Sequence, residues 1–73
     1  MHIYLEITEK LGEEERMVKQ PQELRIEVSS KEEAVKKFEE LKRLFDGVSY
    51  VARVHYHYHE EGKPCEVEVI EET

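Results

Sequence analysis

Three histidines recur at every second position near the end of the chain: His55, His57 and His59. In a β-strand, side chains alternate between the two faces, so residues two apart share a face and stand about 7 Å apart. Imidazole rings at that spacing can tilt toward one ion, and imidazole nitrogen is a common ligand of zinc, nickel and copper. The spacing therefore indicates a metal site on the surface of a strand.

A neighbouring strand could supply further ligands, because apolar and acidic residues alternate after the turn at 61–64. Directly opposed residues share a face, and a two- or four-residue loop sets the apolar members of this strand against the tyrosines before the turn. A loop with a glycine bulge shifts the register by one residue and exposes Val67, so we expect the first register. The predicted pairs are Tyr58–Cys65, Tyr56–Val67 and Val54–Val69 on the core face, and His57–Glu66 and His55–Glu68 on the solvent face.

The predicted metal ligands follow from this register, and zinc is the candidate ion. They are His55, His57, His59, Glu66 and Glu68. A carboxylate on the neighbouring strand can bind the ion directly or orient a histidine ring. The alternative interpretation is that the histidines are ordinary strand residues and that the glutamates only balance charge. A His-x-His pair is a common pattern, so both interpretations stay open at this point.

No other spacing indicates catalysis. The predicted register buries the single cysteine, Cys65, on the core face away from the histidines, where a thiol is inert. No Ser–His–acid set is evident, and the three glycines are isolated in turns, so no phosphate-binding loop is present. We therefore expect a protein that is not an enzyme and that has no cofactor other than the candidate zinc.

The elements that position these residues follow from the periodicity of apolar side chains. Period-two alternation predicts four strands, over 2–9, 24–28, 49–60 and 65–70. Ser30 followed by Glu33 is a capping box, and apolar residues three and four apart predict a helix over 31–46 that ends at Gly47. The glutamate-rich segment 10–15 is predicted to be a turn.

The predicted fold is a two-layer α+β domain that spans residues 1–73 in the order β-β-α-β-β. One helix covers one face of a four-stranded, mostly antiparallel sheet, and the other face stays in water. A right-handed crossover sets the two hairpins side by side, and the strand order second-first-third-fourth makes the long third strand central. Tyr4, Val51 and Ile70 are expected on the open face with the histidines.

Composition narrows the range of partners. The 18 acidic and 11 basic residues give a net charge of −7, which makes binding to a phosphate backbone unfavourable. A single cysteine allows no internal disulfide, and no apolar run approaches the length of a membrane span. The first residues alternate in polarity, unlike a signal peptide. We therefore expect a cytoplasmic protein that contacts neither nucleic acid nor membrane.

The expected function is that of a small scaffold or protein-interaction domain, whose partner is another protein or a second copy of the chain. An open sheet face with aromatic and histidine side chains favours such contacts. The alternative is binding of a divalent transition metal through the histidine cluster. Charged residues make up 40% of the chain and asparagine is absent, which is typical both of hyperthermophile proteins and of idealised designed proteins.

Overall fold

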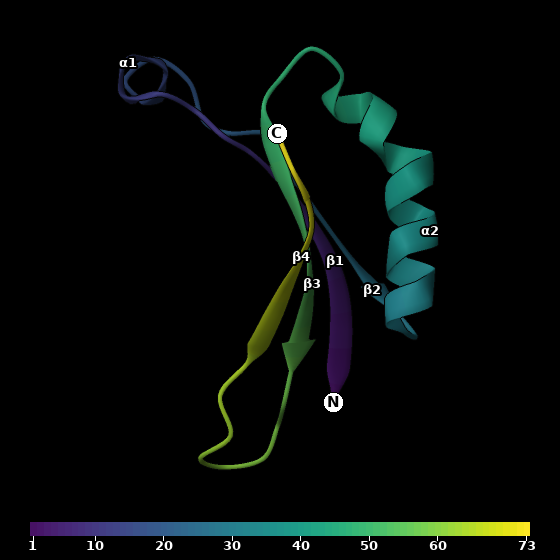
Figure 1. The fold of residues 1–73 in the computed structure, drawn as a ribbon. Coiled ribbons are helices and arrows are strands. Elements are labelled where there is room, and N and C mark those ends of the chain that lie inside the picture. Colours follow the sequence, from purple (N-terminus) through teal and green to yellow (C-terminus); the bar gives the residue numbers. More distant parts are fainter.

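The strands form one antiparallel sheet in the order β2-β1-β3-β4, as Figure 1 shows. The computed structural model describes residues 1–73 and places the strands at β1 (His2–Glu9), β2 (Glu23–Val28), β3 (Tyr50–His57) and β4 (Glu66–Glu72). The main helix, α2 (Lys31–Leu41), covers one face of the sheet and leaves the other face open. The predicted α+β class and the predicted strand order are confirmed.

Helix α2 begins at the predicted cap. The Oγ atom of Ser30 accepts a hydrogen bond from the backbone N–H of Glu33 at 3.1 Å. The Glu33 carboxylate reaches back to Ser29, one residue before the cap, and accepts bonds from its N–H at 3.3 Å and its hydroxyl at 2.8 Å. The predicted helix over 31–46 divides into α2 and a 3₁₀ turn, η1 (Lys42–Phe45). Gly47 follows with a φ of 82°, a conformation that favours glycine.

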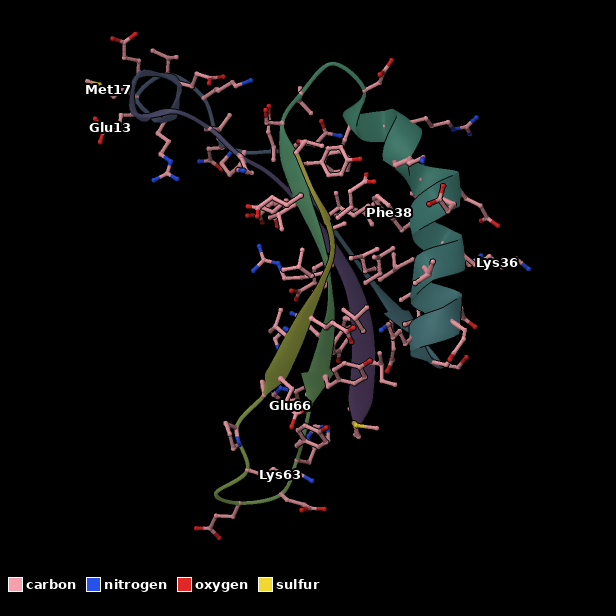
Figure 2. The ribbon with its side chains drawn as sticks, viewed as in Figure 1. Glu13, Met17, Lys36, Phe38, Lys63 and Glu66 are labelled. Atoms are coloured by element: carbon pink, nitrogen blue, oxygen red, sulfur yellow. The ribbon has the colours of Figure 1, made fainter.

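The core lies between α2 and the covered face of β1 and β3. Its fully buried members are Leu5, Ile7, Ala34, Phe38, Phe45, Ala52 and Val54. Figure 2 shows Phe38 pointing from α2 toward the sheet, whereas Lys36 points away on the outer side of the helix. Since the sheet has apolar cover on one side only, polar and charged side chains on the other side remain free to take part in chemistry.

The connection between β1 and β2 contains a short helix, α1 (Glu13–Arg16), in place of the predicted turn. The part of this connection next to β2 is held by Glu9, the last residue of β1, whose side chain is almost fully buried. Its carboxylate accepts a bond from the N–H of Gln22 at 3.0 Å and pairs with Lys19 at 3.2 Å. The hydrogen bond from Gln22 is the main reason that the pKa of Glu9 lies below its ordinary value.

The predicted register of β3 and β4 is wrong by one residue in the part of the hairpin nearest the loop, from the pair Arg53–Val69 to the pair Tyr56–Glu66. The structure pairs His55 with Val67 and Tyr56 with Glu66. Val67 and Val69 are therefore about half exposed, at 52% and 55%, on the open face. Strand β3 also ends at His57, three residues before the predicted end at 60.

A bulge opposite Ala52 and Arg53 shifts the register farther along the hairpin, so that Ala52 pairs with Glu71. Ile70, which was expected on the open face, instead packs against the core as a partly buried residue. Alternation along β4 puts the two valines on the open face and Ile70 on the covered face with Glu66 and Glu68. The bulge adds Glu71 to the covered face, where it meets the hydroxyl of Tyr50.

The register prediction was wrong because it assumed that the apolar side of β4 is buried. β4 is an edge strand, and Ile70 is its only partly buried residue, whereas the other six are exposed. The glutamates on the covered side meet donors instead: Glu68 bonds to Lys31, and the hydroxyl of Tyr50 donates to Glu71. The bond to Glu68 raises the pKa of Lys31. These polar contacts make the observed register favourable without burying either valine.

The observed register predicts unequal costs of truncation along β4. Ile70→Ala should lower the free energy of unfolding by about 1–2 kcal/mol, because it removes a partly buried side chain from the edge of the core. Val67→Ala should change it by less than about 0.5 kcal/mol, because the side chain is already in water. Urea denaturation of both variants measures the difference. A larger loss for Val67→Ala than for Ile70→Ala would support the register expected from the sequence.

Candidate metal centre

The observed register brings the cysteine to the histidines. One ligand atom each from His55, His57 and Cys65 lies within 4.8 Å of the others. The closest contact joins Nδ1 of His57 to Sγ of Cys65 at 3.1 Å. The expectation that Cys65 is buried on the core face is therefore wrong, because the one-residue shift moves it to the open side, where it is exposed.

The structure separates the two predicted carboxylate ligands from this set. Glu66 accepts a hydrogen bond from the hydroxyl of Tyr58 at 3.3 Å, and Glu68 bonds to Lys31 of α2. Both glutamates therefore occupy the side of the sheet that α2 covers. Figure 2 shows Glu66 near the start of β4, where this strand emerges from the hairpin loop.

His59, the third predicted histidine ligand, lies beside the His55–His57–Cys65 set but not within it. Its ring centre is 5.0 Å from that of His57 and 4.7 Å from that of His2. His59 is exposed, and partial desolvation of its ring by neighbouring side chains is the main cause that lowers its pKa. Repulsion from His2 and His57 lowers this pKa further. His59 is consequently biased toward its neutral form, in which a ring nitrogen offers a lone pair.

A carboxylate that sequence reasoning missed holds the ring of His55. Nδ1 of His55 lies 3.1 Å from Oε2 of Glu6, and the same oxygen is 3.3 Å from Nε of Arg25. The other ring nitrogen of His55, Nε2, is buried and has no hydrogen-bond partner. A carboxylate at one ring nitrogen keeps the proton there, so Nε2 presents an unused lone pair.

The role of Glu6 depends on how β1 pairs with β3. Alternation along β1 already puts Glu6 on the open face, but its neighbours depend on the register. The structure sets Glu6 opposite Arg53 and Tyr4 opposite His55. Glu6 thus lies diagonal to His55, close enough for a long side chain to reach it. The sequence indicated only that Glu6 and His55 lie on the same face of the sheet, and this does not show that they are in contact.

The set has the composition of an open zinc site, with two imidazoles and one thiolate. Bond lengths of about 2.0–2.3 Å in a tetrahedral zinc site put ligand atoms about 3.3–3.6 Å apart. The observed spread of 4.8 Å exceeds this by about 1 Å. Cys65 precedes the first residue of β4, so its side chain can move by that amount without breaking a pair of the sheet.

No protein-family model, curated protein or solved structure matches this chain. None of its helices combines the length and the apolar composition needed to cross a membrane. Any functional argument therefore depends on the geometry of the His55–His57–Cys65 set and its surroundings.

The exposed position of Cys65 predicts a reactive thiol in the folded protein. A chromogenic disulfide reagent should modify one thiol per chain without denaturant, at a rate comparable with that of the urea-unfolded chain. The reason is that accessibility limits the reaction of a structural cysteine. Absorbance of the released thiolate measures the rate. A thiol that reacts only after unfolding would contradict the exposed position and would show that Cys65 is buried on the core face.

Proposed function

We propose that this protein binds one Zn²⁺ ion through His55, His57 and Cys65. The observation that supports the proposal is the approach of these three ligand atoms to within 4.8 Å on the open face of the sheet. The residues come from the end of β3 and from the segment that leads into β4. The hairpin therefore brings together residues that are up to ten positions apart in the chain.

The chemistry of the set suits zinc. Two neutral imidazoles and one thiolate offer nitrogen and sulfur donors. Zinc prefers such ligands, whereas cations such as Mg²⁺ prefer oxygen ligands. Binding releases the thiol proton of Cys65, so the ion and the proton compete for the same sulfur. The affinity for zinc should accordingly fall as the solution is acidified.

The contact between Glu6 and His55 supports the same function independently. In zinc sites the ligating histidine commonly donates its second N–H to a carboxylate, which fixes the ring and makes the free nitrogen a stronger ligand. His55 already has this arrangement through Glu6, and Arg25 holds the carboxylate from its other side. A metal ion at Nε2 of His55 would also satisfy a buried atom that otherwise lacks a partner.

Three protein ligands and an exposed position favour reversible binding over a structural role. The hydrophobic core contains none of the three ligands, so the domain can fold without the ion. The fourth coordination position faces solvent, where water or a group from another molecule can occupy it. This function requires no catalytic step. Of the ligands predicted from sequence it keeps His55 and His57, and Cys65 takes the place of His59, Glu66 and Glu68.

Metal titration of the reduced protein tests the proposal. Zn²⁺ and its spectroscopic substitute Co²⁺ should bind with one-to-one stoichiometry, and the Co²⁺ complex should show thiolate charge-transfer absorption. His55→Ala, His57→Ala and Cys65→Ser should each weaken binding by more than about 100-fold, because each removes a direct ligand. Calorimetry with Zn²⁺ gives the affinities.

Glu66→Gln and Glu68→Gln are matched controls for this titration, since both residues lie near the hairpin but on the covered side of the sheet. Neither variant should change the affinity. Unchanged binding in Cys65→Ser, or an equal loss in Glu66→Gln, would contradict the proposed ligand set. His59→Ala should weaken binding by less than about tenfold, because His59 neighbours the set without belonging to it.

The carboxylate of Glu6 should influence zinc affinity without touching the ion. Glu6→Gln should weaken zinc binding by about 10–100-fold, because the ring of His55 loses its charged acceptor. Glu27→Gln serves as the control, since Glu27 is on the same face but pairs with His2. Calorimetry compares the two variants, and circular dichroism checks that both stay folded. Equal affinities would show that Glu6 has no positioning role.

A further inference from the structure

Strand β2 leaves one edge of the sheet without a partner. It is the outermost strand on the side opposite β4, and its pairing with β1 is regular along its length. The strand, Glu23–Val28, contains no proline. Natural edge strands commonly avoid unwanted pairing through proline, bulges or inward-pointing charges, and β2 has none of these within its span.

The backbone groups that face outward on β2 follow from one hydrogen bond. The N–H of Glu9 donates to the carbonyl of Gln22 at 2.8 Å, and hydrogen-bonded pairs recur at every second residue of an antiparallel ladder. Leu24, Ile26 and Val28 therefore direct their backbone groups toward β1. The N–H and C=O groups of the other three residues point away from the sheet; these residues are Glu23, Arg25 and Glu27.

We propose that β2 pairs antiparallel with β2 of a second copy of this chain, with Arg25 opposite Glu27 of that copy. The twofold symmetry of such a dimer creates the Arg25–Glu27 pair twice. Ile26 then lies opposite Ile26 of the second copy, and Leu24 opposite its Val28. The two sheets join into one continuous sheet. The contact lies at the edge opposite the hairpin that carries His55, His57 and Cys65, although Arg25 also contacts Glu6, the carboxylate beside His55.

Charge selects this register among those that hydrogen bonding permits. Residues whose backbone groups point away from the sheet must oppose one another across the contact. The permitted registers are therefore two residues apart. One alternative sets Arg25 against Arg25 and Glu23 against Glu27, which opposes like charges at every pair. A second sets Glu27 against Glu27, which again opposes like charges. A third sets Glu23 against Arg25, but it overlaps only residues 23–25 of each strand. The proposed register overlaps residues 24–28 and opposes unlike charges.

Both side chains of the proposed pair have exposed surface, although each also has a partner within the chain: Arg25 contacts Glu6, and Glu27 contacts His2. The side chain of Arg25 is 55% exposed and that of Glu27 is 53% exposed. The guanidinium of Arg25 lies 4.0 Å above the ring of Tyr4, which holds it on the open face beside the edge. On the covered face, Leu24 and Ile26 are only half-buried in the single chain. Pairing would remove more of their apolar surface from water.

The opposite edge does not fit a second copy. Antiparallel pairing of β4 with itself would set Glu66 against Glu68, or Glu68 against Glu68, and the bulge near Ile70 interrupts the ladder. The same charge rule that favours self-pairing at β2 therefore disfavours it at β4. This difference identifies β2 as the edge through which the chain associates.

Sedimentation velocity over a micromolar to millimolar concentration range tests the proposal. The buffer contains a chelator and a reductant, so that neither zinc bridging nor a Cys65 disulfide can join the chains. The wild-type protein should form a dimer. Arg25→Glu and Glu27→Arg should each weaken it by more than about tenfold, because each opposes like charges in both pairs. The double variant, Arg25→Glu with Glu27→Arg, should restore the wild-type dimer.

Lys36→Glu is the control for net charge, since it makes the same change as Arg25→Glu on the outer side of α2 (Figure 2). It should leave the dimer within about twofold of wild type. Stronger association in Glu27→Arg would indicate the register in which Arg25 opposes Arg25, and it would overturn the proposal. A wild-type chain that stays monomeric at every concentration would overturn it as well.

Amide hydrogen exchange of the wild-type protein provides a test that needs no variant. The amides of Arg25 and Glu27 face outward in the single chain, so their exchange should slow as concentration rises and dimers form. The amide of Ile26, already bonded within the sheet, should change little. Protection that appears in β4 instead of β2 would place the contact at the other edge and overturn the proposal.

Discussion

The position of Cys65 beside His57 depends on the register between β3 and β4. In the observed register the sulfur lies 3.1 Å from an imidazole nitrogen, whereas a shift of one residue would put it on the covered side of the sheet. In the same register, alternation along β4 puts Ile70 on the covered side, where it packs against the core. The geometry of the hairpin thus supports both the edge of the core and the proposed zinc set.

A single layer of helix explains why the open face can carry chemistry. α2 buries apolar side chains from β1 and β3 on one side, and nothing of comparable size covers the other side (Figure 1). Polar side chains on that face need not be removed from water, so histidines, glutamates and arginines can interact across three strands. The contact of Glu6 with both His55 and Arg25 is the clearest example, because it links β1 to strands on either side.

The two edges of the sheet differ in their chemistry. β4 has acidic residues toward the covered side, a bulge and two exposed valines, while β2 has alternating charges of opposite sign and regular pairing. Like charges oppose self-pairing at one edge, and unlike charges favour it at the other. The zinc set and the proposed dimer contact therefore occupy different parts of the molecule, and Arg25 belongs to both regions because it also contacts Glu6.

The sequence by itself determined the four strands and the main helix, the α+β class and the strand order, but not the short helix α1. These depend on local periodicity, on the Ser30 cap and on the rule that one helix covers one face, all of which act over short distances or through general handedness. The same alternation put His55 and His57 on the open face. The sequence also predicted that the helix ends at Gly47, but it did not predict the change from α-helical to 3₁₀ geometry at Lys42.

Only the tertiary structure decided which residues meet. Alternation fixes the register of a strand when one face must be buried, but β4 lies at the edge, where burying Val67 gains little. Contacts with Lys31, Tyr50 and Tyr58 then favour placing the glutamates on the covered side. That balance moved Cys65 to the histidines and Glu66 away from them. The partnership of Glu6 with His55 likewise depends on the pairing of strands far apart in the chain.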